Sequence, residues 1–358
     1  MKLSIITINY NNAEGLHKTL ASVAAQTYRD IEHIIIDGGS TDGSVDIIRE
    51  YENTIKRSVT INQSTIQVKW VSEPDMGIYN AMNKGVEIAL GKRVVDTFNR
   101  STLCGDKNKG IEIALGKRVV NSFNRSELIN DDHTSNITHQ TSQESLNDNR
   151  STLNELQSDY IQILNSGDIL ASPDVTERMM NALHSFIRST LNDKIDVPIL
   201  YGNMVKFDYT NNRILGKSRE VEYSLRQYFS STMNHDCCYF RRDLFETYGL
   251  YDESLKIVSD WKWFLQAIGL GQVKPEYVDI DVTIFDCSGI SETNLALRDQ
   301  ERRQVLKELL PPAILADYDA HAFEIEQMNR LRRRHLYGFV YFIERVLFKL
   351  EKWGVLKK

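Results

Sequence analysis

Cysteine, positive charge and long apolar runs are scarce in this 358-residue chain, and each scarcity excludes a class of protein. Four cysteines are too few for a disulfide framework, and the neighbours Cys237 and Cys238 lack the spacing of a zinc knuckle. The 43 Lys and Arg fall short of the 49 Asp and Glu, so the net charge of −6 offers no general field for nucleic acid. No apolar run approaches the ~18 residues of a membrane-spanning helix. We therefore expect a globular protein that does not bind nucleic acid.

The beginning of the chain lacks the features of an export signal. The apolar run from Leu3 to Ile8 is too short for a signal peptide, and no small-residue cleavage site follows it. Together with the few cysteines, this indicates a reducing, cytoplasmic compartment.

Strand and helix signals alternate through the first ninety residues. Short β-rich runs at 3–8, 31–36 and 68–71 are each followed by apolar residues at helical spacing, the last of them over 78–90. This alternation predicts an α/β fold with a mostly parallel sheet and crossover helices. Ligands of such sheets bind at the carboxyl ends of the strands, and here those ends are rich in Asp, Asn, Gly and Ser.

Residues 92–158 interrupt this alternation. The segment 83–95 recurs almost unchanged as 108–120, which indicates a local tandem duplication because two copies are too few for a solenoid. From 127 to 158, 17 of 32 residues are Ser, Thr, Asn or Gln, with no aromatic residue, Gly or Pro. Such a segment buries too little apolar surface to offset its ordering entropy, so we expect 92–158 to be a disordered insertion.

Regular structure resumes with a fourth strand at 160–164. A helix is expected from about 173 to 187, strands over 199–209 and 273–285, a helix opening at 258, and helices beyond 290.

Carboxylates follow three of the expected strands: Asp37, Asp75 and Asp168. No Gly-x-Gly-x-x-Gly turn or Walker-type loop accompanies them, which argues against a dinucleotide-binding Rossmann domain and a P-loop protein. Each acid taken alone is more often a turn former. Three at one edge predict a site that holds a nucleotide by one carboxylate and a divalent cation such as Mg²⁺ by another.

The motifs that carry these acids resemble the family 2 glycosyltransferases, in particular bacterial members that build surface polysaccharides. The similar segments are Ser4–Asn12, Ile34–Gly43, Glu73–Gly85 and Leu164–Asp168. The resemblance covers residues 1–91 and 159 to about 290, which implies one GT-A glycosyltransferase domain with a mostly parallel central sheet. Residues 291–358 would then form an additional C-terminal helical region.

The resemblance also implies roles for individual residues. The nucleotide-sugar would be bound by Thr7, Asn9, Tyr10, Asp37, Ser40, Asp75 and Lys84, with Asp37 accepting a hydrogen bond from the base, most naturally uracil. Asp168 would coordinate the Mg²⁺ or Mn²⁺ cofactor that bridges the diphosphate. Here the chain departs from the family pattern, because the usual Asp-x-Asp-Asp reads Asn165-Ser166-Gly167-Asp168 and retains only the final carboxylate.

By the same resemblance Asp260 matches the catalytic general base, and His235 lies where the family often carries a histidine near the acceptor or metal. Asp260 also has a structural interpretation as the N-cap of a helix. Direct attack by an acceptor hydroxyl would invert the anomeric centre.

The C-terminal tail is basic and amphipathic. Residues 329–358 carry nine Lys and Arg against two Glu, and apolar residues recur at helical spacing from Phe339 to Trp353. This pattern favours an in-plane contact with a membrane surface, and a helix packed on the protein is nearly as plausible.

The sequence therefore predicts a metal-dependent, inverting glycosyltransferase. Its partners would be a nucleotide-sugar and a glycan or lipid-linked acceptor, in cell-surface polysaccharide biosynthesis. Two alternatives remain. A nucleotidyltransferase would need a Gly-rich basic loop near the N-terminus, which is absent from Ile8 to Ala13. A GT-A-shaped binding protein would result if the insertion had displaced Asp168 and abolished catalysis.

Overall fold

The computed structural model describes residues 1–62, 66–95, 159–188, 197–209, 211–286 and 294–352. The predicted disordered insertion lies outside these residues, except for 92–95. Two compact units are distinguished: unit 1 contains 1–220, 234–251 and 274–286, and unit 2 contains 221–233, 252–273 and 287–358.

The N-terminal part of unit 1 alternates strand and helix as predicted. Its elements are β1 (Leu3–Asn9), α1 (Ala13–Ala24), β2 (Ile31–Asp37), α2 (Ser44–Asn62), β3 (Gln67–Ser72) and α3 (Ile78–Ala89). The fourth predicted strand, β4 (Tyr160–Ile163), pairs in parallel with β1, so Leu3 lies opposite Tyr160 and Ile6 opposite Ile163. The order β3-β2-β1-β4 is parallel throughout, which brings four carboxyl ends to one edge.

The rest of unit 1 extends this sheet. It contains β5 (Ile169–Leu170), α5 (Val175–Arg188), β6 (Ile199–Asp208), β7 (Arg213–Lys217), η1 (His235–Cys237), β8 (Cys238–Arg241), α7 (Leu244–Thr247) and β9 (Pro275–Asp286). Within the described residues the sheet has nine strands in the order β3-β2-β1-β4-β8-β6-β9-β5, with β7 paired to β6. β6 and β9 are parallel, whereas β8, β7 and β5 join antiparallel.

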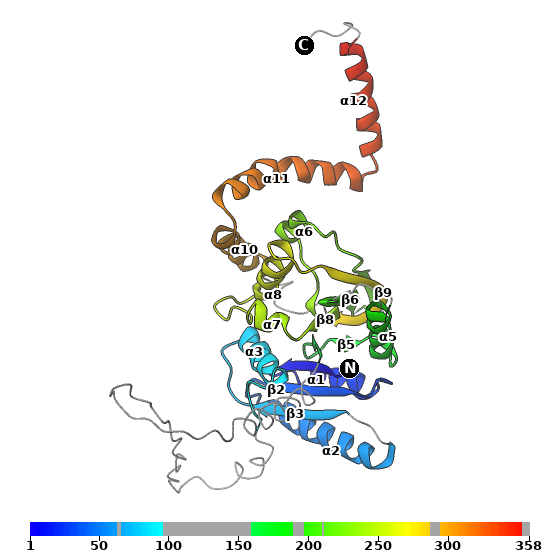
Figure 1. Cartoon of the computed structure of the whole chain (residues 1–358), viewed down its shortest axis with the longest axis vertical. Helices are drawn as coiled ribbons and strands as arrows, with labels where there is room; N and C mark the ends of the chain where they lie inside the picture. Colours follow the sequence, from blue (N-terminus) through cyan, green and yellow to red (C-terminus); the bar gives the residue numbers. More distant parts are fainter. Residues whose placement is uncertain (63–65, 96–158, 189–196, 210, 287–293, 353–358) are drawn as a thin grey trace, which may run out of the picture. The chain divides into compact units, whose positions relative to one another are not determined.

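Helices cover both faces of the parallel strands (Figure 1). On one face, apolar side chains of α1, α2 and α5 form a core with Leu3, Ile5 and Ile35. On the other face α3 lies close to β1, because Gly85 has no side chain. A Cβ at Gly85 would lie 2.3 Å from Cγ2 of Ile6. This close packing places the first turn of α3 beside the carboxyl ends of the strands.

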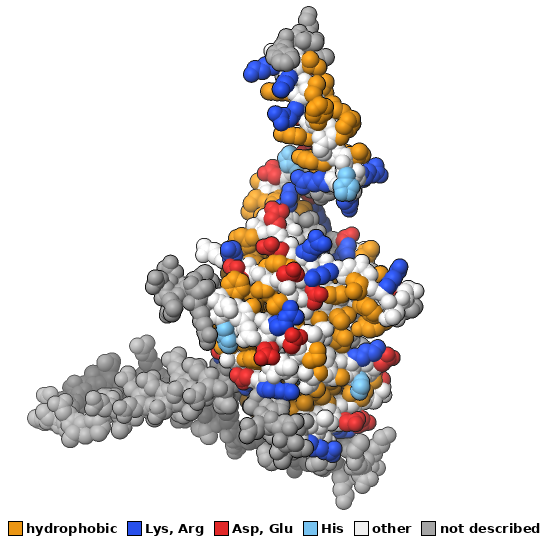
Figure 2. Space-filling view, turned by 90° about the vertical axis from the view of Figure 1, so that its right-hand side faces the viewer, with side chains coloured by type: hydrophobic (Ala, Val, Ile, Leu, Met, Phe, Trp, Pro, Cys, Tyr) orange, Lys and Arg blue, Asp and Glu red, His pale blue; other side chains and the backbone are white. Residues whose placement is uncertain are grey.

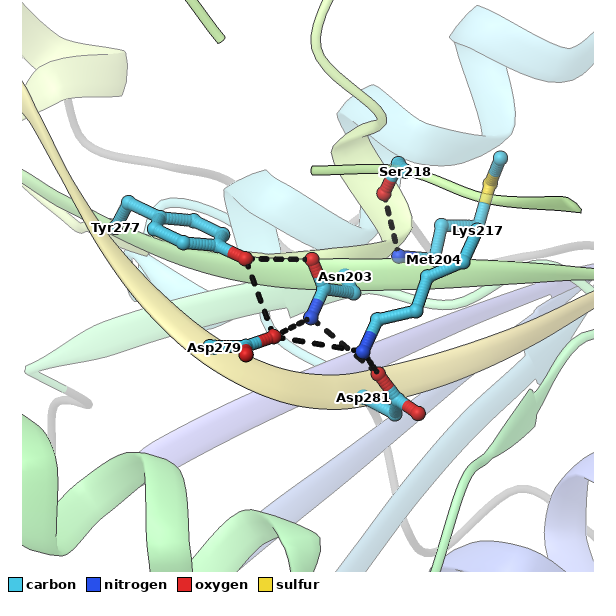
Figure 3. A network of polar contacts seen from close by, with 7 residues as sticks. All are labelled: Asn203, Met204, Lys217, Ser218, Tyr277, Asp279 and Asp281. Carbon is cyan, nitrogen blue, oxygen red and sulfur yellow. Dashed lines mark hydrogen bonds and ion pairs between the residues drawn. The ribbon is translucent and has the colours of Figure 1, made fainter. Parts of the chain in front are cut away.

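Polar side chains hold the strands β6, β7 and β9 together (Figure 3). Buried Asn203 donates to Asp279 (2.8 Å) and accepts from the Tyr277 hydroxyl (2.9 Å). Lys217 pairs with Asp281 at 2.6 Å and Asp279 at 3.4 Å. The β6–β9 register shifts on both sides of Asn203, so these bonds replace regular ladder pairing at this point.

Unit 2 is helical. It contains α6 (Leu225–Ser230), α8 (Ser259–Phe264), η2 (Leu265–Gly269), α10 (Leu295–Leu309), α11 (Pro312–Arg333) and α12 (Tyr337–Lys352). This division differs from the predicted domain boundary near 290, because 221–233 and 252–273 group with the C-terminal helices. The physical reason is contact at long sequence separation: Lys262 pairs with Glu308, and the ring of Phe229 stacks on that of Tyr318.

None of the helices in the described part of the chain combines the length and apolar character that crossing a membrane requires.

Candidate functional site

The carboxyl ends of β1 and β3 and the loop after β2 are joined by the carboxylate of Asp37. Asp37 is fully buried and accepts four hydrogen bonds, from the Asn9 amide (2.8 Å), the Ser40 hydroxyl (2.6 Å) and backbone N–H (3.0 Å), and the Ser72 hydroxyl (2.6 Å). These donors occupy the lone pairs of an ionised carboxylate. For Asp37 to accept a hydrogen bond from a base, one of them would have to leave.

Ser40 links the second loop to the first. Its hydroxyl accepts from the backbone N–H of Asn11 at 2.8 Å, and the Asn11 side chain accepts from the N–H of Thr41 at 2.9 Å. Asn9 keeps a side-chain oxygen, Oδ1, that is buried without a hydrogen-bond partner. An unpartnered buried acceptor is rare, and here it belongs to a predicted nucleotide-binding residue.

Gly38 brings Tyr10 and Asp75 side by side. A Cβ at Gly38 would lie 2.4 Å from Oδ2 of Asp75 and 3.1 Å from Cδ2 of Tyr10, so both side chains flank this glycine. The carboxylate of Asp75 also accepts from the N–H of Gly77 at 3.0 Å. The Tyr10 side chain is 65% exposed, which leaves its ring open to a planar ligand.

Lys84 of α3 reaches back to the third loop. Its ammonium lies 2.9 Å from Glu73 and donates to the carbonyl of Pro74 at 3.2 Å. Arg93 also pairs with Glu73 at 2.6 Å. Lys84, with Arg93 beside it, lowers the pKa of the Glu73 carboxyl. The Lys84 ammonium, which is predicted to lie near the diphosphate, is therefore held at the carboxyl edge of the sheet, and Glu73 partly neutralises its charge.

Thr7 is the exception among the predicted nucleotide-binding residues. It is fully buried, and its hydroxyl lies 3.0 Å from Nε2 of His33, whose Nδ1 lies 2.8 Å from the Tyr51 hydroxyl. Thr7 lies two residues before the end of β1, so its side chain joins a core network beneath the edge. The structure thus differs from the expectation that Thr7 lines a nucleotide pocket.

The loop after β4 carries Asp168 and is held by α1. The Thr19 hydroxyl donates to the carbonyl of Asp168 at 2.7 Å and accepts from the N–H of Gly167 at 3.0 Å. Asn12, the N-cap of α1, donates to the carbonyl of Ser166 at 3.0 Å. His235 lies beside this loop, with Nε2 3.3 Å from the amide nitrogen of Asn165.

The oxygen atoms of this loop suit a divalent cation that keeps few protein ligands. Asp168 supplies a carboxylate, and Oδ1 of Asn165 is buried with no hydrogen-bond partner. Within the described ranges no three His, Cys, Asp or Glu side chains gather as a metal-binding group. Mg²⁺ commonly takes one or two carboxylates and completes its shell with phosphate and water, so these residues fit such an ion.

Asp260, the predicted base, belongs to unit 2. It lies in the first turn of α8, where the helix dipole favours negative charge. The N-cap of α8 is Val258, and no side chain caps this helix. The alternative interpretation of Asp260 as an N-cap is therefore wrong.

Several residues of this edge were not singled out from the sequence. Ser72 and Thr19 position Asp37 and the Asp168 loop, and Glu73 and Arg93 hold Lys84. The sequence could have identified Ser72, because it is a polar residue at the end of the third predicted strand. It could not have identified Thr19, because nothing in the sequence distinguishes it from any other threonine in a helix.

Comparison with known proteins agrees with this geometry. Residues 4–98, which include all three loops, match the model described as Glycosyl transferase family 2. The resemblance to family 2 glycosyltransferases is therefore confirmed over this segment.

Two curated relatives share the same segment. An uncharacterized glycosyltransferase of Mycobacterium tuberculosis is 43% identical over 90 residues, which cover 25% of this chain and 30% of the relative. A PGL/p-HBAD biosynthesis glycosyltransferase of Mycobacterium bovis is 38% identical over 88 residues, which cover 25% and 31%. The aligned segment thus spans about a third of the length of these relatives.

The likeness to solved structures extends further along the chain. Residues 1–349 of S. aureus TarS, crystallised in complex with UDP, align with a TM-score of 0.50 over 92% of this chain and 74% of that one. At 14% identity this concerns the fold alone. The predicted fold class, an α/β fold of the GT-A type with added C-terminal helices, is confirmed.

Proposed function

We propose that this protein is an inverting glycosyltransferase of the cytoplasm. It would move a sugar from a nucleotide-sugar to a hydroxyl of a glycan or lipid-linked acceptor in cell-surface polysaccharide biosynthesis. The expected donor is a UDP-sugar. One observation carries the proposal: the family 2 match over 4–98 includes the three strand ends that Asp37 joins at the carboxyl edge of the sheet. The M. bovis relative is named for PGL/p-HBAD biosynthesis, which supports a biosynthetic role for this glycosyltransferase.

In this proposal the donor nucleotide lies across the loops after β1, β2 and β3. The exposed ring of Tyr10 would stack on the base, and Oδ1 of Asn9 would accept from it or from the ribose. Asp37 and Ser40 would keep these loops in place. Asp75 would bind the ribose, and Lys84 would lie near the diphosphate, where it would exchange part of its contact with Glu73 for phosphate oxygens. The UDP bound to TarS supports uridine as the base.

The chemistry proposed is a single displacement. An acceptor hydroxyl attacks the anomeric carbon, its proton passes to the carboxylate of Asp260, and the bond between the sugar and the diphosphate breaks. The leaving diphosphate takes the bonding electron pair, and the configuration is inverted. Mg²⁺ or Mn²⁺ held by Asp168, with Asn165 beside it, would neutralise charge on the diphosphate. His235 would bind the acceptor or orient Asn165, which its ring contacts.

Thermal unfolding with nucleotides tests the donor site. The parent, Asp168→Ala and the control Asp46→Ala are each heated with UDP, GDP, dTDP and CDP, with and without Mn²⁺. Asp46 lies in the first turn of α2, and its exposed carboxylate pairs with Arg49 rather than with a predicted site residue. We expect UDP with Mn²⁺ to raise the midpoint of the parent and of Asp46→Ala but not of Asp168→Ala. A folded parent that responds to no nucleotide would contradict the proposal.

The alternative of a binding protein inactivated by the insertion requires Asp168 to be displaced. Against this, β4 keeps a continuous parallel register with β1 from Tyr160 to Ile163, and Thr19 holds the following loop. A chain that binds UDP but releases none from any UDP-sugar would nevertheless favour the alternative.

We also propose that α12 lies on an anionic membrane surface, near a lipid-linked acceptor. None of its described side chains is buried. Phe339, Phe342, Ile343 and Val346 are exposed at helical spacing on one face, and Figure 2 shows apolar side chains along this helix with Lys and Arg beside them. On the neighbouring face the spacing brings together Arg345, Lys349 and Lys352. Basic residues flanking an apolar face fit anionic headgroups above a lipid interior.

Vesicle sedimentation tests this surface. The full chain is mixed with vesicles of phosphatidylcholine alone or with added phosphatidylglycerol. We expect binding only with the anionic lipid, weakened on the order of 100-fold when Arg345, Lys349 and Lys352 are all changed to Gln. The control changes Arg226, Arg213 and Lys274, which are exposed and lie outside α12, to Gln. Equal binding to both vesicles, or self-association through α12 in light scattering without vesicle binding, would contradict the proposal.

A further inference from the structure

Helix α10 lies beyond the predicted catalytic domain, yet three of its charged side chains contact the segment that carries Asp260. All of these residues belong to unit 2. Glu301 is the first. It is 7% exposed, and its two carboxylate oxygens accept from the backbone N–H groups of Lys256 at 2.8 Å and Ile257 at 2.9 Å. These two peptide groups directly precede α8, so Glu301 fixes the backbone from which that helix starts.

Glu308 contacts α8 itself, through the side chain of Lys262. Both of its oxygens accept from the Lys262 ammonium, at 2.8 and 3.0 Å, and Asp252 accepts from it at 2.8 Å. Burial acts to raise the pKa of Asp252, but hydrogen bonds from Lys262 and Ser254 outweigh it and lower that pKa to about 2. The two carboxylates therefore hold the Lys262 ammonium, and although burial acts to lower the pKa of Lys262, their hydrogen bonds raise it.

Arg302 lies between these two anchors. Its guanidinium carbon is 5.2 Å from the centre of the Trp261 ring, and the Trp261 indole donates to the carbonyl of Tyr228 at 2.6 Å. Burial lowers the pKa of Arg302 and the charge of Arg298 lowers it further, whereas the charges of Asp260 and Asp299 act to raise it. The guanidinium thus lies against Trp261, the residue next to Asp260, and the charge of Asp260 acts on it.

We infer that α10 is the positioning element for the base of the transfer reaction, with Arg302 as the positioning residue that orients the Asp260 carboxylate. The inference rests on the proposed role of Asp260. Glu301 holds the backbone that precedes α8, and Glu308 holds Lys262 within that helix. Arg302 then acts on the one side chain of this helix that would take the acceptor proton. A planar, permanently charged guanidinium suits this task, because it can stack on the Trp261 ring and attract the Asp260 carboxylate at the same time.

The test measures UDP release from UDP-glucose, UDP-N-acetylglucosamine and UDP-galactose by the full chain with Mn²⁺, with water as the acceptor. Variants are Asp260→Asn, Arg302→Met, Arg302→Lys, and the double variant of Asp260→Asn with Arg302→Met. The matched control is Arg303→Met, because Arg303 is the next residue of α10 and pairs with Asp319 on the surface.

We expect Arg302→Met to lower kcat on the order of 10- to 100-fold with little change in KM for the donor, since it misplaces the base and leaves the donor loops untouched. Arg302→Lys should recover part of this loss, and Arg303→Met should stay within about twofold of the parent. In the double variant, Arg302→Met should add no further loss to that of Asp260→Asn. If Arg302→Met does not fold, Arg302→Lys and its double variant with Asp260→Asn carry the same comparison.

The outcomes separate this inference from the proposed function. Loss of kcat in Asp260→Asn with an unchanged kcat in Arg302→Met overturns the positioning role alone. An additional loss in the double variant does the same, because Arg302 would then act independently of Asp260. An unchanged kcat in Asp260→Asn, or a parent that releases no UDP, overturns both.

Discussion

At the residue scale, Gly38 controls where the Asp75 carboxylate lies. The position of its missing Cβ is 2.4 Å from Oδ2 of Asp75, closer than a methyl group can approach an oxygen. Because the Asp75 carboxylate is the end of a flexible side chain, we expect Gly38→Ala to move this carboxylate rather than unfold the protein. In titrations the dissociation constant for UDP should rise by about tenfold, and the free energy of unfolding should change by less than about 1 kcal/mol.

Gly216→Ala is the control for Gly38→Ala, because a Cβ at Gly216 meets nothing within 4 Å. It should leave UDP binding unchanged. Equal binding by both variants and the parent would show that the Asp75 carboxylate does not contribute to the nucleotide site.

Also at the residue scale, burial lowers the pKa of His33 to about 3. The folded-state pKa lies below the ordinary value of 6.5, so the unfolded chain binds the proton first as the pH falls. The stability associated with a neutral His33 is complete above pH 6.5 and is lost as the pH falls toward 3. At pH 5 the loss is about 2 kcal/mol.

His33→Gln removes this titration and keeps a side chain able to bond with Thr7 and Tyr51. Denaturant unfolding at pH 7.5 and pH 5 should therefore show a smaller drop in stability for His33→Gln than for the parent, by about 2 kcal/mol. His17, exposed on α1, is the control, and His17→Gln should behave as the parent. Identical drops in His33→Gln and the parent would mean that His33 is not buried in its neutral form.

At the element scale, the close packing of α3 on β1 depends on Gly85. We expect Gly85→Ala to destabilise the fold by about 1–3 kcal/mol, because its methyl group would overlap Cγ2 of Ile6. Ile6→Ala alone should destabilise by about 2–5 kcal/mol by leaving a cavity. The double variant should lose at least about 1 kcal/mol less stability than the two single losses added together, since the new methyl group fills the cavity left at Ile6. Additive effects in urea unfolding would contradict this packing.

At the scale of the whole molecule, α12 contributes little to folding. Because none of its described side chains is buried, a chain that ends at Leu336 should unfold with a free energy within about 0.5 kcal/mol of the parent. A chain that ends at Leu310 is the contrasting control. It loses the stack of Tyr318 on Phe229 and the ion pair of Asp319 with Arg303, so it should be clearly less stable. A large destabilisation on removal of α12 alone would indicate that its apolar face packs on the protein.

Much of the fold could be predicted from the sequence because the parallel strands are short apolar runs bounded by polar turns. The expected strand at 199–209 is observed as 199–208, and the helix expected at 173–187 is observed as 175–188. The candidate site was predicted as a set of residues but not as a network. Only contacts reveal that Asp37 is saturated by donors, that Thr7 belongs to the core, and that Glu73 holds Lys84.

The sequence by itself determined the α/β alternation, the family 2 motifs and the edge of the sheet at which polar loops gather, because periodicity and turn chemistry are local properties. The tertiary structure alone decided that α10 contacts the Asp260 segment and that 221–233 and 252–273 group with the C-terminal helices. Pairs such as Lys262 with Glu308 lie 46 residues apart. Nothing in the local pattern around either residue specifies its partner, because a charged side chain on a helix looks the same whether it faces water or an opposite charge.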